Sequence, residues 1–352
     1  MPRPGSVNFA MEGPNSEMAA LGLDIVCIGH AIVDRLARVE DGVLVSAGIE
    51  RGAMTLVDEA QIAAIESLVP EWVQVAGGSA ANTAVGLASF GEVPTFVGSV
   101  GDDLLGAEYE SYLEAVGVHC VLSHGSADLS TGQCLVLVDD ESGRSMATNL
   151  GSGVVIDVEA AELGCADGPV VVYIEGYLLD SPETAAAVER AAELAKGGDG
   201  LVALSLSDPF VVERHHELLR SLVESKVDLL FANGEEARCF TGAPDVMAAL
   251  DALEVMELTC AVTLGEHGAV ILSGGERAII EARPVERVED TTGAGDLFAA
   301  GVLHGIVRGA PLETAGRLGA LAAAEIISHL GAQPRTPLRA LAEQSGLGGP
   351  WK

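Results

Sequence analysis

The chain has 352 residues, of which 49% are hydrophobic, 52 are acidic and 19 are basic, so its formal net charge is −33. A protein with so negative a field repels nucleic acids and anionic membranes, and neither is expected as a partner. The length permits one large α/β domain or two smaller ones. The acidity fits either a saline habitat or a simple need for solubility.

The N-terminus and the cysteines bear on where the protein works. Residues 1–20 mix Pro, Gly, Asn and Glu and lack the apolar stretch of a signal peptide, so we expect a disordered tail. No apolar run approaches the ~20 residues that span a bilayer. The six cysteines form no CxxC pair and no metal-ligand spacing, which favours reduced thiols in a cytoplasmic protein.

Short β-rich runs alternate along the chain with alanine-rich helical stretches. Continuous apolar strands separated by helices predict a mostly parallel sheet covered on both faces. The clearest helix follows Ser181 and Pro182, which fit its N-cap and first position, and ends at Gly197. The expected strands lie at residues 24–29, 94–101, 170–176, 201–207, 227–233 and 260–265.

Two segments depart from this alternation. Residues 130–150 predict a β-hairpin that turns at DDESG, because strands flanking a polar, glycine-containing turn pair most easily with each other. Together with residues 35–57 the hairpin can form a small lid beside the main sheet. The alternative to a lid is that both segments are surface additions without a functional role.

The first glycine-rich stretch is AGGSAANTAVGLASFG, residues 76–91. Gly77 and Gly78 precede a helix of small residues, and Asn82 lies in its first turn. A buried amide side chain needs hydrogen-bond partners, which a polyol ligand would supply. A helix cap or an internal hydrogen bond would satisfy it equally well.

The second glycine-rich stretch is TTGAGD, residues 291–296, directly before an apolar helical run. Its glycines let backbone amides approach a ligand, and the start of a helix favours an anion. The negative charge of Asp296 would repel a phosphate there. The conflict is resolved if Asp296 accepts a proton from a hydroxyl that receives a phosphoryl group. A capping aspartate is the alternative. No P-loop occurs, and Phe298 stands where a dinucleotide fingerprint needs a small residue.

Taken in order, GGSAANTA and DTTGAGD resemble the two signatures of the ribokinase-like (PfkB) family of sugar and nucleoside kinases. The stretches CIGHAIVD, VGDDLLG, NGEE, TLGEHG and GAQP add to the resemblance, which covers residues 22–337. RGAMTLVDEAQ and GRSMATNLGSG are similar to the bacterial adenosine-kinase-like group. The resemblance implies a three-layer α/β sandwich with a mostly parallel central sheet and a small β-sheet lid. Its kinase domain would span residues 21–340, followed by a tail at 341–352.

The resemblance also implies transfer of the ATP γ-phosphoryl group to a primary hydroxyl, with Mg²⁺ and, in many members, K⁺. The residues that match catalytic positions are Asp296 as base, Gly293, Ala294 and Gly295 as anion hole, and Arg144 on the lid facing the phosphates. The matches at the substrate are Asp34 and Asn82 on sugar hydroxyls, Gly77 and Gly78 as hinge, and Glu175 and Tyr177.

Further matches concern the nucleotide and the metals. Those on the nucleotide side are Asn233, Glu236, Thr263, Gly265 and Gly268, of which Glu236 would also act on magnesium through water. Asp290 and Thr292, with the loop at residues 331–334, match the monovalent-cation loops. Structural alternatives exist: Asp34 and Asn233 could be caps, and Glu236 and Arg144 could be solvated.

The identity of the acceptor stays open at this stage. By resemblance, Tyr177 matches the position where adenosine kinases carry a stacking aromatic residue, which favours adenosine. Glu175 could instead bind a sugar hydroxyl, as in ribokinases. We expect an adenosine-kinase-like enzyme with a small-molecule substrate, as a monomer or homodimer. A kinase for ribose, fructose or another free sugar is the first alternative. A non-catalytic sugar- or nucleoside-binding protein is an alternative of a different class.

Overall fold

The computed structural model describes residues 25–52, 54–125, 129–139 and 144–351. The expected N-terminal tail therefore lies outside the described residues. In the described part of the chain, no helix is long and apolar enough to cross a membrane.

The larger of two β-sheets runs in the order β14-β13-β12-β11-β10-β9-β1-β5-β6 and is parallel from β6 to β12. Only β13 and β14 join it antiparallel. Its strands are β1 (Ile25–Ile28), β5 (Thr95–Val100), β6 (His119–His124), β9 (Val171–Glu175), β10 (Leu201–Ser205), β11 (Leu229–Asn233), β12 (Thr259–Thr263), β13 (Ala269–Ser273) and β14 (Glu276–Ile280). The six strand runs predicted from the sequence are confirmed as β1, β5, β9, β10, β11 and β12.

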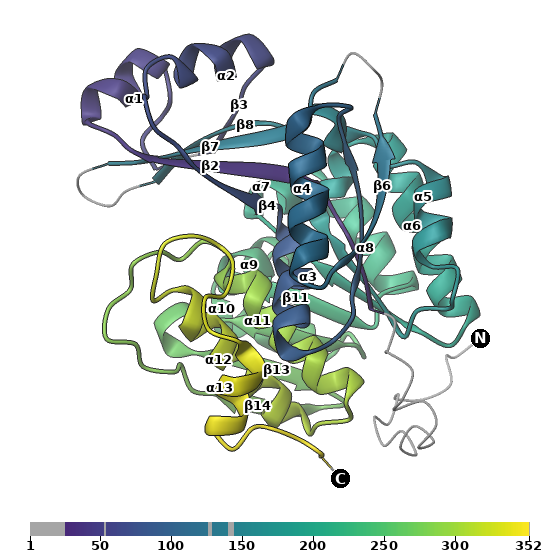
Figure 1. Ribbon diagram of the computed structural model, residues 1–352. Helices are drawn as coiled ribbons and strands as arrows, with labels where there is room; N and C mark the ends of the chain where they lie inside the picture. The colour runs from purple at the N-terminus through teal and green to yellow at the C-terminus, as the bar shows by residue number, and fades with distance from the viewer. Residues whose placement is uncertain (1–24, 53, 126–128, 140–143, 352) are drawn as a thin grey trace.

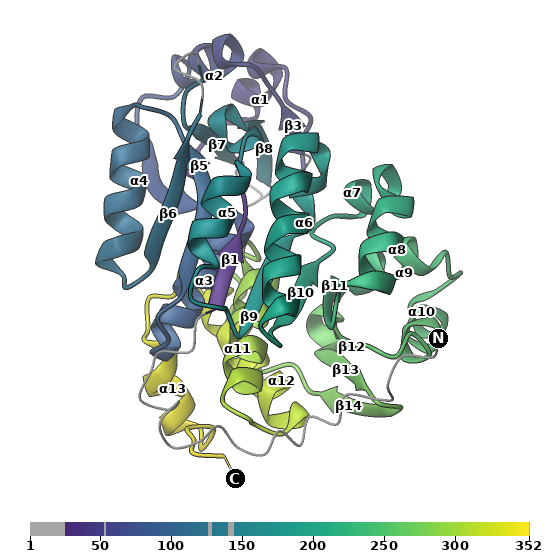
Figure 2. The same cartoon turned by 90° about the vertical axis from the view of Figure 1, so that its right-hand side faces the viewer.

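Helices cover both faces of this sheet, which explains why its central strands are apolar along their whole length (Figure 2). One face carries α5 (Val158–Gly164), α6 (Pro182–Gly197), α7 (Pro209–Arg214), α8 (His216–Ser225), α9 (Gly234–Thr241) and α10 (Val246–Glu254). The other carries α3 (Ser79–Phe90), α4 (Leu104–Ala115), α11 (Ala294–Val307) and α12 (Leu312–Ile326). The predicted three-layer α/β sandwich is confirmed.

The helix predicted after Ser181 is confirmed as α6, with Pro182 in its first turn and its C-cap at Gly198. The Ser181 side chain does not cap it. Its hydroxyl donates instead to the Val154 carbonyl, at 2.8 Å.

A smaller sheet lies apart from the first, in the order β3-β8-β7-β2-β4 (Figure 1). Its strands are β2 (Ile32–Arg38), β3 (Met54–Leu56), β4 (Val73–Gly77), β7 (Gly132–Val138) and β8 (Arg144–Asn149). β7 and β8 pair antiparallel, as the hairpin pattern predicted, although the turn itself lies outside the described residues. α1 (Asp41–Ala47) and α2 (Glu59–Glu66) pack on one face of this sheet around Leu135 and Leu137.

The last helix, α13 (Leu338–Gln344), crosses the expected domain boundary at residue 340. Leu338 and Ala342 are buried beside α3, α11 and α12, and the Trp351 ring meets His304 edge-on at 5.8 Å. This end of the chain is therefore packed onto the main body.

Candidate active site

A cavity of about 850 Å³ lies between the two sheets. Its floor is formed at the carboxyl ends of β9, β10, β11 and β12, where ligands bind in open parallel sheets. Its roof is the inner face of the small sheet. Strand residues alternate between faces, so Ile32, Asp34 and Cys134 point to the cavity while Leu135 and Leu137 pack under α1 and α2.

Most of the residues predicted from the sequence meet in this cavity. Those that line it are Asp34, Gly78, Asn82, Glu175, Tyr177, Asn233, Glu236, Thr263, Thr292, Gly293, Ala294, Gly295 and Asp296. Those outside its lining are Gly77, Arg144, Gly265, Gly268 and Asp290.

Asp296 lies in the first turn of α11 and faces the N-terminal turn of α3. Its two carboxylate oxygens accept hydrogen bonds from the Ser79 hydroxyl at 2.7 Å and the Asn82 amide at 2.9 Å. Burial raises the pKa of Asp296 to about 6, although the two hydrogen bonds act in the opposite direction. The carboxylate is therefore mainly ionised at neutral pH and can accept a proton. The Asn82 side-chain oxygen is buried without a partner inside the described residues and is left for a ligand.

The start of α11 has a backbone geometry that could hold an anion, and we call it the anion cradle. Gly293 adopts φ 77°, and a Cβ there would come within 2.9 Å of Ala332. A Cβ on Gly295 would meet nothing within 4 Å, so the space beside it is open. The first N–H groups of a helix have no intrahelical acceptor, although the Ala294 N–H donates to the Thr291 carbonyl at 3.2 Å.

Asp34 explains the glycine at position 77. The two residues lie on the adjacent strands β2 and β4, and a Cβ on Gly77 would come within 2.3 Å of the Asp34 carboxylate. Burial and the negative charge of Asp296 raise the pKa of Asp34 to about 7, with Arg144 acting in the opposite direction. Asp34 is therefore a strand residue in the cavity rather than a helix cap.

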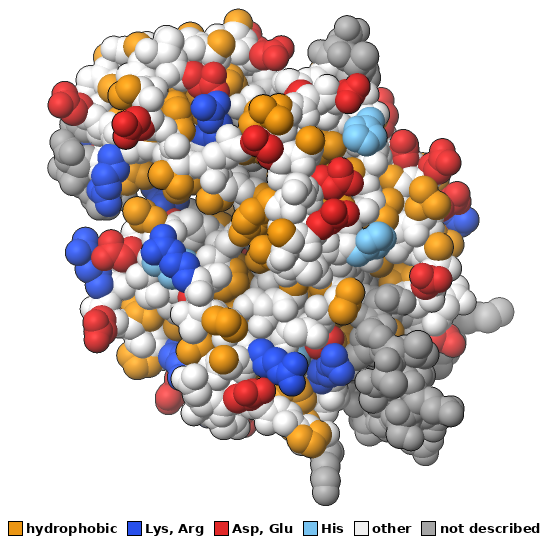
Figure 3. Space-filling view, in the orientation of Figure 1, with side chains coloured by type: hydrophobic (Ala, Val, Ile, Leu, Met, Phe, Trp, Pro, Cys, Tyr) orange, Lys and Arg blue, Asp and Glu red, His pale blue; other side chains and the backbone are white. Residues whose placement is uncertain are grey.

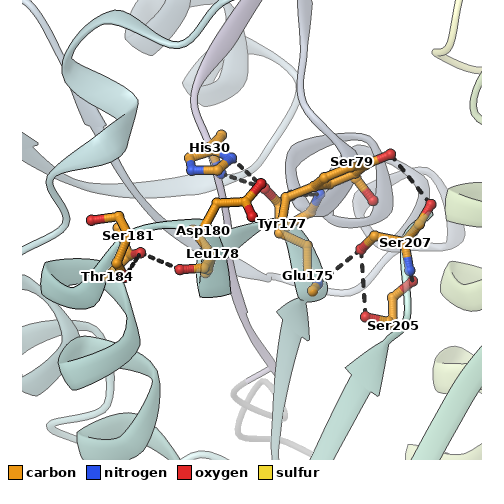
Figure 4. Close-up of polar contacts among 12 residues, drawn as sticks. His30, Ser79, Glu175, Tyr177, Leu178, Asp180, Ser181, Thr184, Ser205 and Ser207 are labelled. Atoms are coloured by element: carbon orange, nitrogen blue, oxygen red, sulfur yellow. Dashed lines mark hydrogen bonds and ion pairs between the residues drawn. The ribbon is translucent and has the colours of Figure 1, made fainter. Parts of the chain in front are cut away.

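Glu175 ends β9 and is almost fully buried. Its carboxylate accepts hydrogen bonds from the backbone N–H groups of His30 at 2.8 Å and Ala80 at 2.9 Å, and the His30 ring lies 3.2 Å away (Figure 4). Both oxygens are thus engaged in holding the start of α3 against the loop after β1.

Tyr177 follows β9 and lines the cavity. Its hydroxyl donates to the Ser207 carbonyl at 3.3 Å (Figure 4), while the Ser207 hydroxyl accepts from the Gly176 N–H at 2.8 Å. The aromatic rings of Tyr177 and the exposed Phe210 both line the cavity. They provide apolar surface for a planar group.

Asn233 and Glu236 form a capping box at the start of α9. The Asn233 side chain accepts from the Glu236 N–H at 2.8 Å, and the Glu236 carboxylate accepts from the Asn233 N–H at 2.9 Å. Glu236 is buried, and burial, with repulsion from Asp208 and Asp296, raises its pKa to about 7. The Asn233 amide also donates to the second Glu236 oxygen, at 2.6 Å, so each of these oxygens already accepts a hydrogen bond. A divalent cation would relieve the repulsion, and Mg²⁺ would be held here through water rather than by direct contact.

Arg144 is the first residue of β8, and its side chain extends from the small sheet to the main body of the protein. Its guanidinium forms an ion pair with Asp290 and a hydrogen bond with the Thr292 hydroxyl, and its side chain is 15% exposed. Asp290 also accepts from the N–H groups of Thr292 and Gly331, both at 2.8 Å. Arg144 is therefore not simply solvated.

The predicted nucleotide-side turn divides into two parts. Thr263, at the end of β12, lines the cavity. Gly265 and Gly268 instead shape the turn between β12 and β13, where Gly268 has φ 85° and a Cβ would lie 2.0 Å from the Ile280 carbonyl. Any contact of these glycines with a nucleotide would therefore be made by backbone.

Sequence reasoning missed several residues of the cavity. Ser79 stands inside the quoted glycine-rich motif, but its partner Asp296 is 217 residues away. His30 similarly stands inside CIGHAIVD. Asp208 precedes α7 and carried no motif that could have singled it out.

Comparison with known proteins decides the family. Residues 23–339 match the pfkB family of carbohydrate kinases. The chain belongs to this family. It is therefore a phosphotransferase that acts on a hydroxyl group, and ATP is the donor expected for its members.

Two solved structures and a curated relative resemble this chain over nearly their whole length. An adenosine kinase from Sinorhizobium meliloti is 38% identical, covers 92% of this chain and 99% of its own, and gives a TM-score of 0.85. A probable sugar kinase from Rhizobium etli CFN 42 is 37% identical with the same coverage and a TM-score of 0.87. Adenosine kinase of Saccharomyces cerevisiae is 29% identical over 87% of this chain and 95% of its own.

Proposed function

We propose that the protein transfers the γ-phosphoryl group of ATP to the primary hydroxyl of a ribonucleoside, with adenosine as the favoured acceptor. The observation that carries the proposal is the buried Asp296 carboxylate beside the open N-terminus of α11, held by Ser79 and Asn82. A carboxylate there can accept the hydroxyl proton while backbone amides stabilise the transferring phosphoryl group.

In this mechanism the chain contributes mainly position and charge. Asp34 and the free Asn82 oxygen bind acceptor hydroxyls, and Asp296 accepts the proton late in the transfer. Mg²⁺, held near Asn233 and Glu236, would neutralise charge on the phosphates when bound. The small sheet acts as a lid that excludes water from the transferring group.

Two features favour a nucleoside over a free sugar. The cavity presents apolar surface that suits a planar base. It comes from Ile32 and Met146 on the small sheet, from Leu150 just after β8, and from Tyr177. Both oxygens of Glu175 are engaged by backbone N–H groups, which argues against their use for a sugar hydroxyl. The adenosine kinase names of two relatives agree, whereas the name of the Rhizobium protein keeps a free sugar as the second candidate.

We also propose that the protein acts as a monomer. The outer face of the small sheet is covered by α1 and α2, which bury Leu44, Ile62 and Ile65 against it. This face is thereby closed to pairing with the same face of a second copy.

A panel of acceptors tests the proposal. ATP consumption is measured with adenosine, inosine, ribose, fructose and 2-keto-3-deoxygluconate, and we expect the highest kcat/KM with adenosine. Asp296→Asn should lower kcat at least ~10²-fold because the base is lost, with little change in ATP affinity by calorimetry. Asp199→Asn is the matched control, because Asp199 is exposed at φ 61°, a conformation that Asn tolerates.

Near-normal turnover of Asp296→Asn would show that another group is the base. Tight adenosine binding without phosphorylation of any acceptor would instead indicate a binding protein.

A further inference from the structure

Arg144 contacts the two residues that the family resemblance assigns to a monovalent-cation site. Asp290 and Thr292 are the residues matched to that cation, and the Arg144 guanidinium contacts the side chains of both. Asp290 is only 3% exposed, so this is a buried ion pair rather than a surface contact.

The Asp290 carboxylate has little left to offer a metal ion. Its Oδ1 accepts from the Thr292 N–H, and its Oδ2 accepts from the Gly331 N–H and pairs with Arg144. A K⁺ ion at this carboxylate would lie beside a fixed positive charge of the same sign, which is unfavourable in a buried setting. The residues present therefore do not fit a bound monovalent cation while Arg144 stays in place.

The contacts of Arg144 join the segments that frame the anion cradle. Asp290 and Thr292 lead into Gly293 and α11, and Gly331 precedes Ala332, against which Gly293 packs. The positive charge of Arg144, paired with Asp290, thus fixes the positions of the segments on both sides of the cradle. Guanidinium is suited to this task because it stays protonated and offers several N–H donors in a fixed plane.

We infer that the guanidinium of Arg144 replaces a monovalent cation in this protein, so that the anion cradle is held without K⁺. Because Arg144 belongs to β8, the charge is delivered by the small sheet rather than by a free ion. The part of this inference that concerns catalysis depends on the proposed kinase reaction, whereas the part that concerns cation binding does not.

The experiment compares the wild type with Arg144→Met in KCl and in tetramethylammonium chloride at equal ionic strength. Two quantities are measured: the rate of phosphoryl transfer and the midpoint of thermal unfolding. Wild-type protein should give equal values of both in the two salts. Arg144→Met should lose roughly 10²-fold in rate in tetramethylammonium, regain part of it in K⁺, and unfold at a higher temperature in K⁺ because an ion now binds the folded state.

Two controls make the result specific. Arg38→Met removes an exposed positive charge from the same sheet and should respond to salt as the wild type does. Arg144→Met/Asp290→Asn also lacks the carboxylate, so its unfolding midpoint should lose the K⁺ response.

Specific K⁺ activation or K⁺ stabilisation of the wild type would overturn the inference. So would an Arg144→Met variant whose rate and unfolding midpoint respond to K⁺ no more than those of the wild type. If no acceptor is phosphorylated, the proposed function fails, but the unfolding midpoints still decide the question of the cation.

Discussion

At the scale of single residues, the cavity concentrates carboxylates whose charged forms are disfavoured. Burial raises the pKa of Asp34 and of Glu236 to about 7 and that of Asp296 to about 6. Such shifts are typical of functional sites, where groups are placed for chemistry rather than for stability. These three acids should therefore lower the stability of the folded protein when they are ionised.

Replacing Asp34 with Asn tests whether its ionised form destabilises the folded protein. The folded-state pKa of Asp34 lies above its unfolded value of 3.8, so the folded protein binds more protons than the unfolded chain between pH 3.8 and about 7. The contribution of Asp34 to stability therefore falls as pH rises through this window. Asp34→Asn should raise the free energy of unfolding by roughly 1–3 kcal/mol at pH 8, with a gain that shrinks toward pH 4, and should reduce phosphoryl transfer.

Denaturant unfolding at several pH values measures the effect, with Asp199→Asn as the exposed control. A variant that is no more stable than the wild type at pH 8 would show that the Asp34 carboxylate is not desolvated in the folded protein.

At the scale of elements, the proposed active site depends on how α3 is anchored. Its first turn carries Ser79 and Asn82, which orient Asp296 on α11, while Glu175 on β9 binds the Ala80 N–H at the same turn. Three elements far apart in sequence thus meet at one helix N-terminus. A change at Glu175 should act on catalysis without touching the reacting groups.

Glu175→Gln is the corresponding substitution. Glutamine offers one acceptor oxygen in place of two, so the N–H of His30 or of Ala80 loses its partner. We expect a loss of about 1–3 kcal/mol in the free energy of unfolding and a fall in kcat with a smaller change in acceptor KM. The exposed Glu189→Gln on α6 serves as control. Unchanged stability and kcat would contradict the anchoring role.

At the scale of the whole molecule, the charge of −33 opposes the approach of ATP. On the face drawn in Figure 3, acidic and basic side chains are interspersed, and the Lys and Arg side chains form no continuous surface. In the proposed reaction, the anion cradle and Mg²⁺ would therefore have to overcome a repulsive long-range field.

Salt should consequently help this enzyme to capture ATP. Raising tetramethylammonium chloride from about 0.01 M to about 0.1 M shortens the Debye length from roughly 30 Å to roughly 10 Å, so kcat/KM for ATP should increase severalfold. The KM for uncharged adenosine should stay nearly constant, which separates screening from a general effect on the enzyme. A fall of kcat/KM for ATP with salt would mean that local positive charge, not the net charge, governs association.

The sequence by itself determined the three-layer architecture, because apolar strands buried on both faces and intervening helices are encoded in local patterns. It also located the glycine-rich stretches around Asn82 and Asp296 through their motifs. Only the tertiary structure decided what these residues contact: the Ser79 hydroxyl meets a carboxylate 217 residues away, and Arg144 reaches Thr292 across 148 residues. Such contacts, and the burial that raises the pKa of Asp34, arise from how α3, α11 and the two sheets pack, and no local pattern records that packing.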